Sequence, residues 1–387
     1  MGIRGFFIGG AIVMGAVFLY VGGALFPVTY DPNTPNTDAR EETEIKKPIP
    51  AKHLPTPEPL RALYMTSWVA GTPSMRSHVV NLIENTEASA IVIDIKDYSG
   101  TIAFPVTSDI VMKEGFIEER IPDVKSLIAN LHERGIYVIG RITVFQDPLY
   151  AKKYPERAVQ KKSDTSVWKD YKGLSFVDVS AREYWDYIVA LSEDAYALGF
   201  DELNFDYIRF PSDGNMKDIY YPVSGEMIAQ DPENGKAIAL ENFFAYLAQK
   251  LNKTDVVLSA DLFGMTTTNT DDLNIGQVLE RAIPYFDYIA PMVYPSHYPN
   301  TFIGLSDPNK YPYEVVKYSL DKAVARMVVA STTPAKIRPW LQDFDYGGNY
   351  GEKEVRAQIQ ATYDTGLTSW MLWDPANRYT PEALNKE

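Results

Sequence analysis

The 387-residue chain has no cysteine, which excludes disulfides, thiolate metal sites, a cysteine nucleophile and a lipid-modified cysteine. With only four histidines, a metal site built from several imidazoles is not expected either. Basic residues are outnumbered, and the net charge of −14 argues against a nucleic-acid partner, because phosphate binding needs a basic surface. No phosphate-binding glycine loop follows any predicted strand. We therefore expect neither a metal nor an organic cofactor.

One long apolar run is present near the N-terminus, at residues 6–26. It exceeds the roughly 18 residues that indicate a membrane-spanning helix. Arg4 precedes it and Asp31 is the first charge after it, an arrangement that exports the remainder of the chain. Residues 1–26 are therefore predicted to be a transmembrane signal-anchor at the cell membrane, with the C-terminal domain extracytoplasmic. Cleavage at the small residues 22–24, which would give a secreted protein, is the alternative.

Residues 27–59 are rich in Pro, Thr and Glu, so we predict a disordered, extended linker. In residues 60–387, short apolar runs alternate with longer helix-like segments, which predicts a parallel sheet covered on both faces. The strand candidates are 62–68, 90–96, 137–145, 202–210, 256–263, 288–294, 338–344 and 369–373. The helix candidates are 74–85, 124–133, 182–198, 236–251, 275–282, 313–328 and 352–364. Eight strands predict a closed (β/α)8 TIM barrel, with an open doubly wound sheet as the alternative.

Polar side chains gather where the predicted strands end, which is where TIM barrels carry their chemistry. The densest group lies in residues 199–214, read as GFDELNFDYIRFPSDG. A period of two places Asn204 and Asp206 on one face of their strand, and does the same for Asp94 and Lys96 and for Ser259 and Asp261. The side chains that we expect to contact a substrate at this mouth are Trp68, Asp94, Lys96, Arg141, Asn204, Arg209, Tyr294, His297, Gln342, Asp343 and Trp373.

Paired carboxylates with no nucleotide loop, thiolate or histidine cluster indicate glycoside hydrolysis. The many tyrosines and tryptophans near the strand ends fit a polysaccharide or oligosaccharide substrate, since their flat faces can pack on sugar rings. Asp206 is predicted to be the nucleophile or base, and Asp261 the general acid. A non-catalytic glycan-binding module of the cell envelope is the alternative. An enzyme acting on peptidoglycan, rather than on a secreted polysaccharide, is a third interpretation.

The segment GFDELNFDYIRFP resembles the signature of a family of glycoside-hydrolase-like TIM-barrel domains, long catalogued as a domain of unknown function. The likeness extends over residues 60–381 and includes RALYMTSW, IVIDIKDYSG, DLFG and APMVYPSHY. This resemblance implies a barrel and an action on polysaccharide.

Two better-characterised glycosidase groups resemble this strand more distantly. In the chitinase-type pattern DxxDxDxE, Asp201, Asn204 and Asp206 fall on the aspartates, but Ile208 falls on the glutamate that acts as general acid. An isoleucine cannot donate a proton, so that acid must come from elsewhere. In the amylase-type pattern, Asp206 and Asp261 occupy places similar to those of the nucleophile and the acid. There Asn204 stands where an arginine is usual, and the acid is one methylene shorter than a glutamate.

Overall fold

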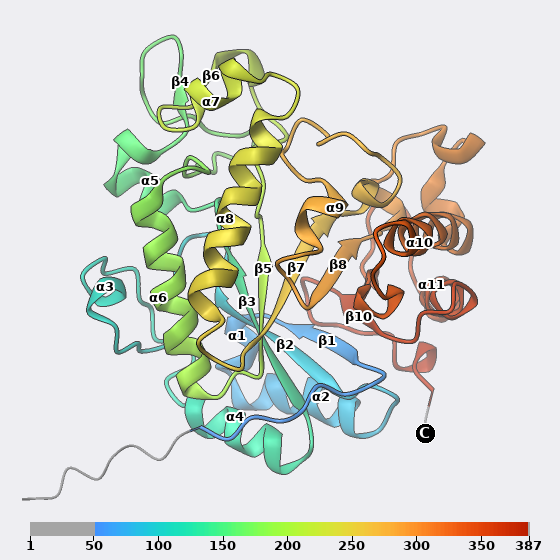
Figure 1. The fold of residues 1–387 in the computed structure, drawn as a ribbon. Coiled ribbons are helices and arrows are strands. Elements are labelled where there is room, and N and C mark those ends of the chain that lie inside the picture. The colour runs from blue at the N-terminus through green and yellow to red at the C-terminus, as the bar shows by residue number, and fades with distance from the viewer. Residues whose placement is uncertain (1–50, 386–387) are drawn as a thin grey trace, which may run out of the picture. The chain divides into compact units, whose positions relative to one another are not determined.

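The computed structural model describes residues 51–385, in which eight parallel strands close into a barrel (Figure 1). Neighbouring strands follow the order of the chain, and β10 pairs with β1 to complete the circle. The strands are β1 (Arg61–Met65), β2 (Ala90–Lys96), β3 (Tyr137–Thr143), β5 (Glu202–Asp206), β7 (Val257–Phe263), β8 (Tyr288–Met292), β9 (Trp340–Gln342) and β10 (Trp370–Trp373). The predicted (β/α)8 TIM barrel is confirmed, and the open sheet is excluded.

Helices cover the outside of the barrel, close to the predicted ranges, and α6 and α8 pack side by side (Figure 1). The longer ones are α2 (Pro73–Glu84), α4 (Val124–Glu133), α6 (Arg182–Leu198), α8 (Gly235–Leu251), α10 (Pro312–Val329) and α11 (Glu352–Asp364). Gly199 ends α6 with a φ of 116°, a left-handed conformation that glycine adopts without strain. The helix predicted at 275–282 is shorter, as α9 (Leu279–Ala282), because Leu273, Asn274 and Gly276 before it have positive φ.

Short elements extend the loops that follow the strands. Residues of the loops after β3 and β5 form a small antiparallel ribbon, which lies with α7 at the top of Figure 1. The short helices are α1 (Ser67–Ala70), α3 (Asp109–Met112), α5 (Pro148–Lys153) and α7 (Gly225–Gln230), and the ribbon is β4 (Gln160–Lys161) with β6 (Ile219–Tyr220). Trp68 was predicted at the end of a strand, but it lies in α1. The strand stops earlier because the Thr66 side chain caps that helix, accepting a hydrogen bond from the Val69 amide at 3.2 Å.

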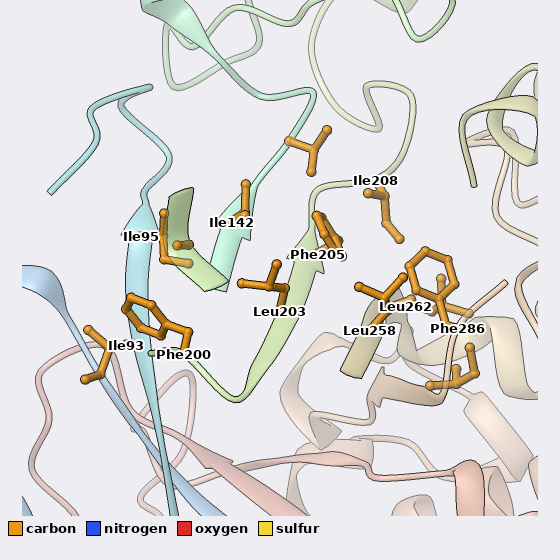
Figure 2. Close-up of a cluster of buried hydrophobic side chains, with 14 of the residues drawn as sticks. Ile93, Ile95, Ile142, Phe200, Leu203, Phe205, Ile208, Leu258, Leu262 and Phe286 are labelled. Atoms are coloured by element: carbon orange, nitrogen blue, oxygen red, sulfur yellow. The ribbon is translucent and has the colours of Figure 1, made fainter. Parts of the chain in front are cut away.

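The main apolar core lies between the strands and the helices, as Figure 2 shows for β2, β3, β5 and β7. One face of each strand supplies this layer, and the other face points into the barrel. The side chains labelled there are Ile93, Ile95, Ile142, Phe200, Leu203, Phe205, Ile208, Leu258, Leu262 and Phe286. Each buried side chain of this size contributes about 1.5–3 kcal/mol to folding, so this layer is the main stabilising feature of the barrel.

A buried ion pair joins β5 to the segment before β9 inside the barrel, at the N-terminal ends of the strands. Arg338 donates a hydrogen bond from Nη1 to Oε2 of Glu202 at 2.7 Å, and both side chains are almost fully buried. The hydroxyl of Tyr137 donates to the same oxygen at 3.3 Å. Charged side chains therefore lie inside the barrel at the N-terminal ends of the strands, as well as at the mouth formed by their C-terminal ends.

Replacing Arg338 alone should destabilise the protein strongly. An Arg338→Met variant leaves the Glu202 carboxylate buried without its cation, which typically costs about 3–5 kcal/mol of unfolding free energy. Urea denaturation of the two single variants, Arg338→Met and Glu202→Gln, and of the double variant measures this effect. We expect the double variant to be more stable than Arg338→Met, and an additive loss would contradict the ion-pair interpretation.

The chain just before β1 packs under the barrel. Leu54 donates its amide to Asp201 at 2.7 Å, and the Thr56 hydroxyl lies 3.1 Å from that of Tyr137. Asp201 also accepts a hydrogen bond from the Val138 amide, so its side chain joins this segment to β3. Residues 51–59, the end of the predicted linker, therefore belong structurally to the barrel.

The transmembrane anchor predicted at 1–26 and the rest of the linker, 27–50, lie outside the described residues. Within residues 51–385, no helix combines the length and apolarity needed to cross a membrane.

Candidate active site

Two adjoining cavities open at the C-terminal ends of the strands, and we call them the first and second lobes. The first lobe has a volume of about 700 Å³ and the second about 690 Å³. They share part of their walls, namely Arg141, Tyr207, Arg209, Trp373 and Pro375. Asp206, Asp261, Tyr294, His297 and Asp343 line the first lobe, whereas Trp68 and Asp94 line the second. Most of the predicted substrate contacts therefore converge on one mouth.

Arg141 stands at the centre of the mouth and joins the carboxylates of two neighbouring strands. From β3 it donates a hydrogen bond to Asp94 on β2 at 2.7 Å, and it donates from both Nε and Nη2 to Oδ2 of Asp206 on β5. All three side chains are buried. Although burial alone would lower the pKa of Arg141, the charges of Asp206 and Asp94 raise it well above its usual value. The guanidinium is therefore a fixed positive charge between two carboxylates.

Asp206 is the last residue of β5, and both of its oxygens accept hydrogen bonds. Oδ2 accepts from Arg141, with Nε at 3.1 Å, and Oδ1 accepts from the backbone amide of Tyr207 at 2.6 Å. Tyr207 has a φ of 51°, which ends the strand and turns its amide toward the carboxylate. These donors fix the orientation of the Asp206 carboxylate at the mouth, as a positioned nucleophile or base requires.

Asp261 occupies the neighbouring position on β7 and has a different environment. Its Oδ1 accepts hydrogen bonds from Asn204 at 2.8 Å and from the Trp340 indole at 2.7 Å. Burial and the nearby charge of Asp206 raise its pKa well above the usual value, against the opposing influence of Arg141. Asp261 is thus suited to hold a proton at a pH at which a free aspartate has already lost it, as a general acid must.

Behind Asp94 lies an aromatic stack that borders both lobes. The Tyr64 hydroxyl donates a hydrogen bond to Asp94 at 2.6 Å, and the Tyr64 ring stacks on Trp373 with centroids 3.8 Å apart. The Arg141 guanidinium lies 4.9 Å from the centroid of the Trp373 ring. Burial raises the pKa of Asp94, although Arg141 and Tyr64 act in the opposite direction. These contacts hold Arg141 in one orientation, facing Asp206.

The far wall of the first lobe carries two further carboxylates from the ends of β9 and β10. Asp343 accepts two hydrogen bonds from Thr380, from the amide at 2.9 Å and from the hydroxyl at 2.7 Å. Burial raises its pKa to about 7. Asp374 accepts from the backbone amides of Ala376 and Arg378. Because their oxygens are used to hold the last loop, these two groups shape the wall, while their side chains remain on its surface.

An aromatic cluster closes the first lobe on the side of β8. The His297 ring lies 5.5 Å from that of Tyr294 and 5.6 Å from that of Tyr346, measured between centroids. Burial lowers the pKa of His297, and burial together with Asp261 and Asp206 raises that of Tyr294 well above its usual value. Gln342 lies behind this cluster, where its Oε1 accepts a hydrogen bond from the Ser296 hydroxyl at 2.8 Å. It therefore positions the loop that carries His297.

Lys96 was predicted to share the face of Asp94, and this prediction was wrong. The β2–β3 pairing shifts register between these two residues, so Lys96 turns out of the barrel interior. There it is fully buried, and it bonds to the Thr143 carbonyl at 2.7 Å and pairs with Asp147 at 2.9 Å. This position gives it a structural role beside α6, where the Tyr184 hydroxyl completes its set of acceptors.

Two other predicted contacts have distinct positions. Asn204 is fully buried behind Asp261, and its amide also donates to the Ser259 hydroxyl at 3.1 Å, so it holds the Asp261 side chain in place. Arg209 lies between the lobes, where it donates to the Ser212 hydroxyl at 2.9 Å and extends over the Tyr207 ring.

Tyr64 and Trp340 were not among the predicted site residues, although both bond directly to site carboxylates. The two-residue alternation of side chains along a strand could have placed both of them inside the barrel. Tyr64 lies two residues after Ala62 on the inner face of β1, and Trp340 lies two before Gln342 on β9. Among residues 51–385, no group of three or more histidine, aspartate or glutamate side chains is arranged to hold a metal ion.

Solved structures with the same fold include carbohydrate-active enzymes. The glycoside hydrolase domain of PgaB (BpsB) from Bordetella bronchiseptica is 15% identical, with a TM-score of 0.61 over 85% of this chain and 99% of that chain. Alpha-L-fucosidase isoenzyme 2 from Paenibacillus thiaminolyticus is 12% identical, with a TM-score of 0.57 over 84% of this chain and 47% of that chain. At these identities the similarity shows the barrel fold alone.

A hypothetical protein from Ruminiclostridium thermocellum ATCC 27405 is 33% identical, with a TM-score of 0.45 over 51% of this chain and 96% of that chain. No curated protein sequence matches the chain. The family model described as "Putative glycosyl hydrolase domain" (DUF4015) matches residues 62–379, which is most of the chain. The protein therefore belongs to this family of glycosyl-hydrolase-like TIM-barrel domains.

Proposed function

We propose that this barrel is a glycoside hydrolase that cleaves a cell-envelope or extracellular polysaccharide with two carboxyl groups. The observation that carries the proposal is the contrast between Asp206 and Asp261, which lie on adjacent strands in opposite environments. Asp206 accepts hydrogen bonds from Arg141 and a backbone amide, whereas burial raises the pKa of Asp261. A carboxylate held by hydrogen-bond donors can serve as base or nucleophile, and a neighbouring carboxyl group with a raised pKa can serve as the acid.

In the proposed reaction, Asp261 donates its proton to the oxygen of the leaving sugar while Asp206 attacks or stabilises the anomeric carbon. Asn204 pairs with Ser259 and Phe205 with Ala260, so Asp206 lies next to Asp261 across the two strands. Neighbouring strands are about 4.8 Å apart. Side chains at paired positions of such strands can approach to the roughly 5–5.5 Å that separates the carboxyl groups of retaining glycosidases, whereas inverting enzymes need roughly 6.5–9.5 Å. Retention of anomeric configuration is therefore the expected outcome.

Incubation of the purified full-length chain with a polysaccharide panel tests this function. The panel contains chitin, chitosan, xylan, soluble starch, a soluble β-glucan and peptidoglycan, and new reducing ends are measured over time. For a polymer that is cleaved, proton NMR of the first product identifies its anomer. Reducing ends with a retained anomer are expected. No new reducing ends from any member would contradict the hydrolase, and an inverted anomer would contradict the nucleophilic role of Asp206.

A non-catalytic glycan-binding module is the second candidate, and the position of Ile208 favours it. The chitinase-type acid would stand at this position, but Ile208 is fully buried in the outer core with Phe205 and Leu262 (Figure 2). The positive φ of Tyr207 breaks the strand alternation and turns residue 208 away from the mouth. Binding of a panel polysaccharide without cleavage would support this candidate.

The cellular location is part of the proposal and is supported by the sequence alone. The apolar run 6–26 and the linker after it would hold the barrel outside the cytoplasm, near an envelope or extracellular polysaccharide. Alkaline phosphatase fused after residue 387 would be active if the C-terminus is exported, and an inactive but stable fusion would contradict the proposed location.

A further inference from the structure

The second lobe is a well-defined cavity that contains neither of the two proposed reacting carboxyl groups. Asp206 and Asp261 line the first lobe, but the second lobe is nearly equal in volume and continues from it across a shared wall. That wall contains Arg141, Arg209 and Trp373, so the second lobe begins where the reacting groups end. A single sugar at the carboxyl pair would leave this second cavity empty.

An exposed tryptophan held in a fixed position lines the second lobe. Trp68, on α1, is 58% exposed, which is unusual for so large an apolar side chain. The Arg120 guanidinium lies over its ring, 4.4 Å from the centroid, and covers one face. With that face covered, the other is available for an apolar surface such as one side of a sugar ring.

Arg120 is itself fixed, which makes Trp68 a rigid platform. It pairs with Asp97, donates a hydrogen bond to the Ser67 hydroxyl at 3.1 Å, and donates another to Glu118 at 2.8 Å. Asp97 in turn accepts hydrogen bonds from the amide and hydroxyl of Ser99. A side chain that is already ordered loses little conformational entropy when a ligand binds.

The rest of the lining suits sugar hydroxyls. Tyr98 is exposed to the same extent as Trp68 and lines the same lobe. Asp170, Lys172 and Ser212 add charged and hydroxyl groups to its walls. Aromatic faces combined with dispersed polar groups provide apolar contact and hydrogen bonds together, which a run of sugar rings requires.

We propose that the second lobe binds the continuation of the polysaccharide chain, with Trp68 as its stacking platform, so that the enzyme cleaves internal bonds. The substrate is then a polymer that crosses the mouth from one lobe to the other, and exposed chain ends are not required. The internal cleavage rests on the proposed hydrolase function, whereas the binding of polymer by the second lobe does not.

The test compares the full-length chain with its Trp68→Ala variant, and uses Tyr318→Ala as the matched control because Tyr318 is an exposed aromatic on α10, outside both lobes. Viscosity and reducing ends are followed together on the polymer that the panel identifies. An internal cleaver lowers viscosity early, when few reducing ends have formed. We expect Trp68→Ala to lower kcat/KM on the polymer about tenfold, with a much smaller effect on a nitrophenyl glycoside of the same sugar.

A binding measurement separates this inference from the hydrolase function. In the Asp206→Asn background, Trp68→Ala should weaken the affinity for the polymer about tenfold, and Tyr318→Ala should leave it unchanged. Weakened binding without any cleavage in the parent protein would support the second lobe and overturn the hydrolase. Reducing ends without an early fall in viscosity would overturn internal cleavage. Equal affinity of the Trp68→Ala and parent proteins, or no binding to any panel polysaccharide, would overturn the role of the second lobe.

Discussion

An Asp206→Asn variant should lose nearly all hydrolytic activity, with kcat lower by on the order of 10³–10⁶-fold. The amide keeps the shape of the side chain but cannot carry the negative charge that attacks or stabilises the anomeric carbon. It also removes the charged partner that Arg141 has at Oδ2. The measurement is the rate of reducing-end formation from a polysaccharide cleaved by the parent protein.

The control for this variant is Asp321→Asn, which removes the carboxylate of an exposed ion pair with Lys317 on α10, outside both lobes. That change should leave kcat unaltered because the pair lines neither lobe, and it should leave the fold intact because exposed pairs contribute little to stability. Thermal unfolding of both variants shows whether the fold is kept. A folded Asp206→Asn protein with the turnover of the parent would exclude Asp206 as nucleophile or base.

The barrel could be predicted from the sequence because its signals are local and repeated. Each strand candidate is a short apolar run, and all but the last are followed by a segment with helical periodicity, so eight strands and seven helices allow few other arrangements. The convergence of Asp206 and Asp261 could also be predicted. Both occupy the inner face near the end of their strands, and the parallel register brings such positions together.

The errors arose where the backbone departs from regular geometry. A register shift within β2 turns Lys96 away from Asp94, and the positive φ of Tyr207 ends β5 before Ile208. No glycine or proline marks either position in the sequence, and tyrosine rarely adopts a positive φ. The period of two places Trp340 on the inner face of β9, but its hydrogen bond to Asp261 joins residues 79 positions apart, and the period alone does not identify that partner.

The general acid should control the alkaline limb of the pH–rate profile. Asp261 must be protonated to donate to the leaving oxygen, so activity should fall as the pH rises through its raised pKa. In Asp261→Asn that limb should disappear, and kcat/KM on the polysaccharide should fall by about 10²–10⁴-fold. The loss should be much smaller on a nitrophenyl glycoside, because nitrophenolate leaves without protonation. An unchanged alkaline limb in the variant would identify another group as the acid.

The same pKa shift predicts that Asp261→Asn stabilises the protein at neutral pH. An aspartate in the unfolded chain loses its proton near pH 3.9, whereas Asp261 in the folded barrel keeps its proton to a higher pH. Unfolding free energy therefore falls as the pH rises from about 4 through the folded pKa, since the unfolded state binds fewer protons there. Asparagine has no such titration and can still accept the hydrogen bonds from Asn204 and Trp340 through its carbonyl oxygen.

Urea denaturation between pH 4 and pH 8 should show a flatter pH dependence of the unfolding free energy in the Asp261→Asn variant than in the parent. A variant whose stability depends on pH as steeply as that of the parent would contradict the raised pKa of Asp261, because the free-energy cost of ionising this buried carboxyl group is what suits it to act as the acid.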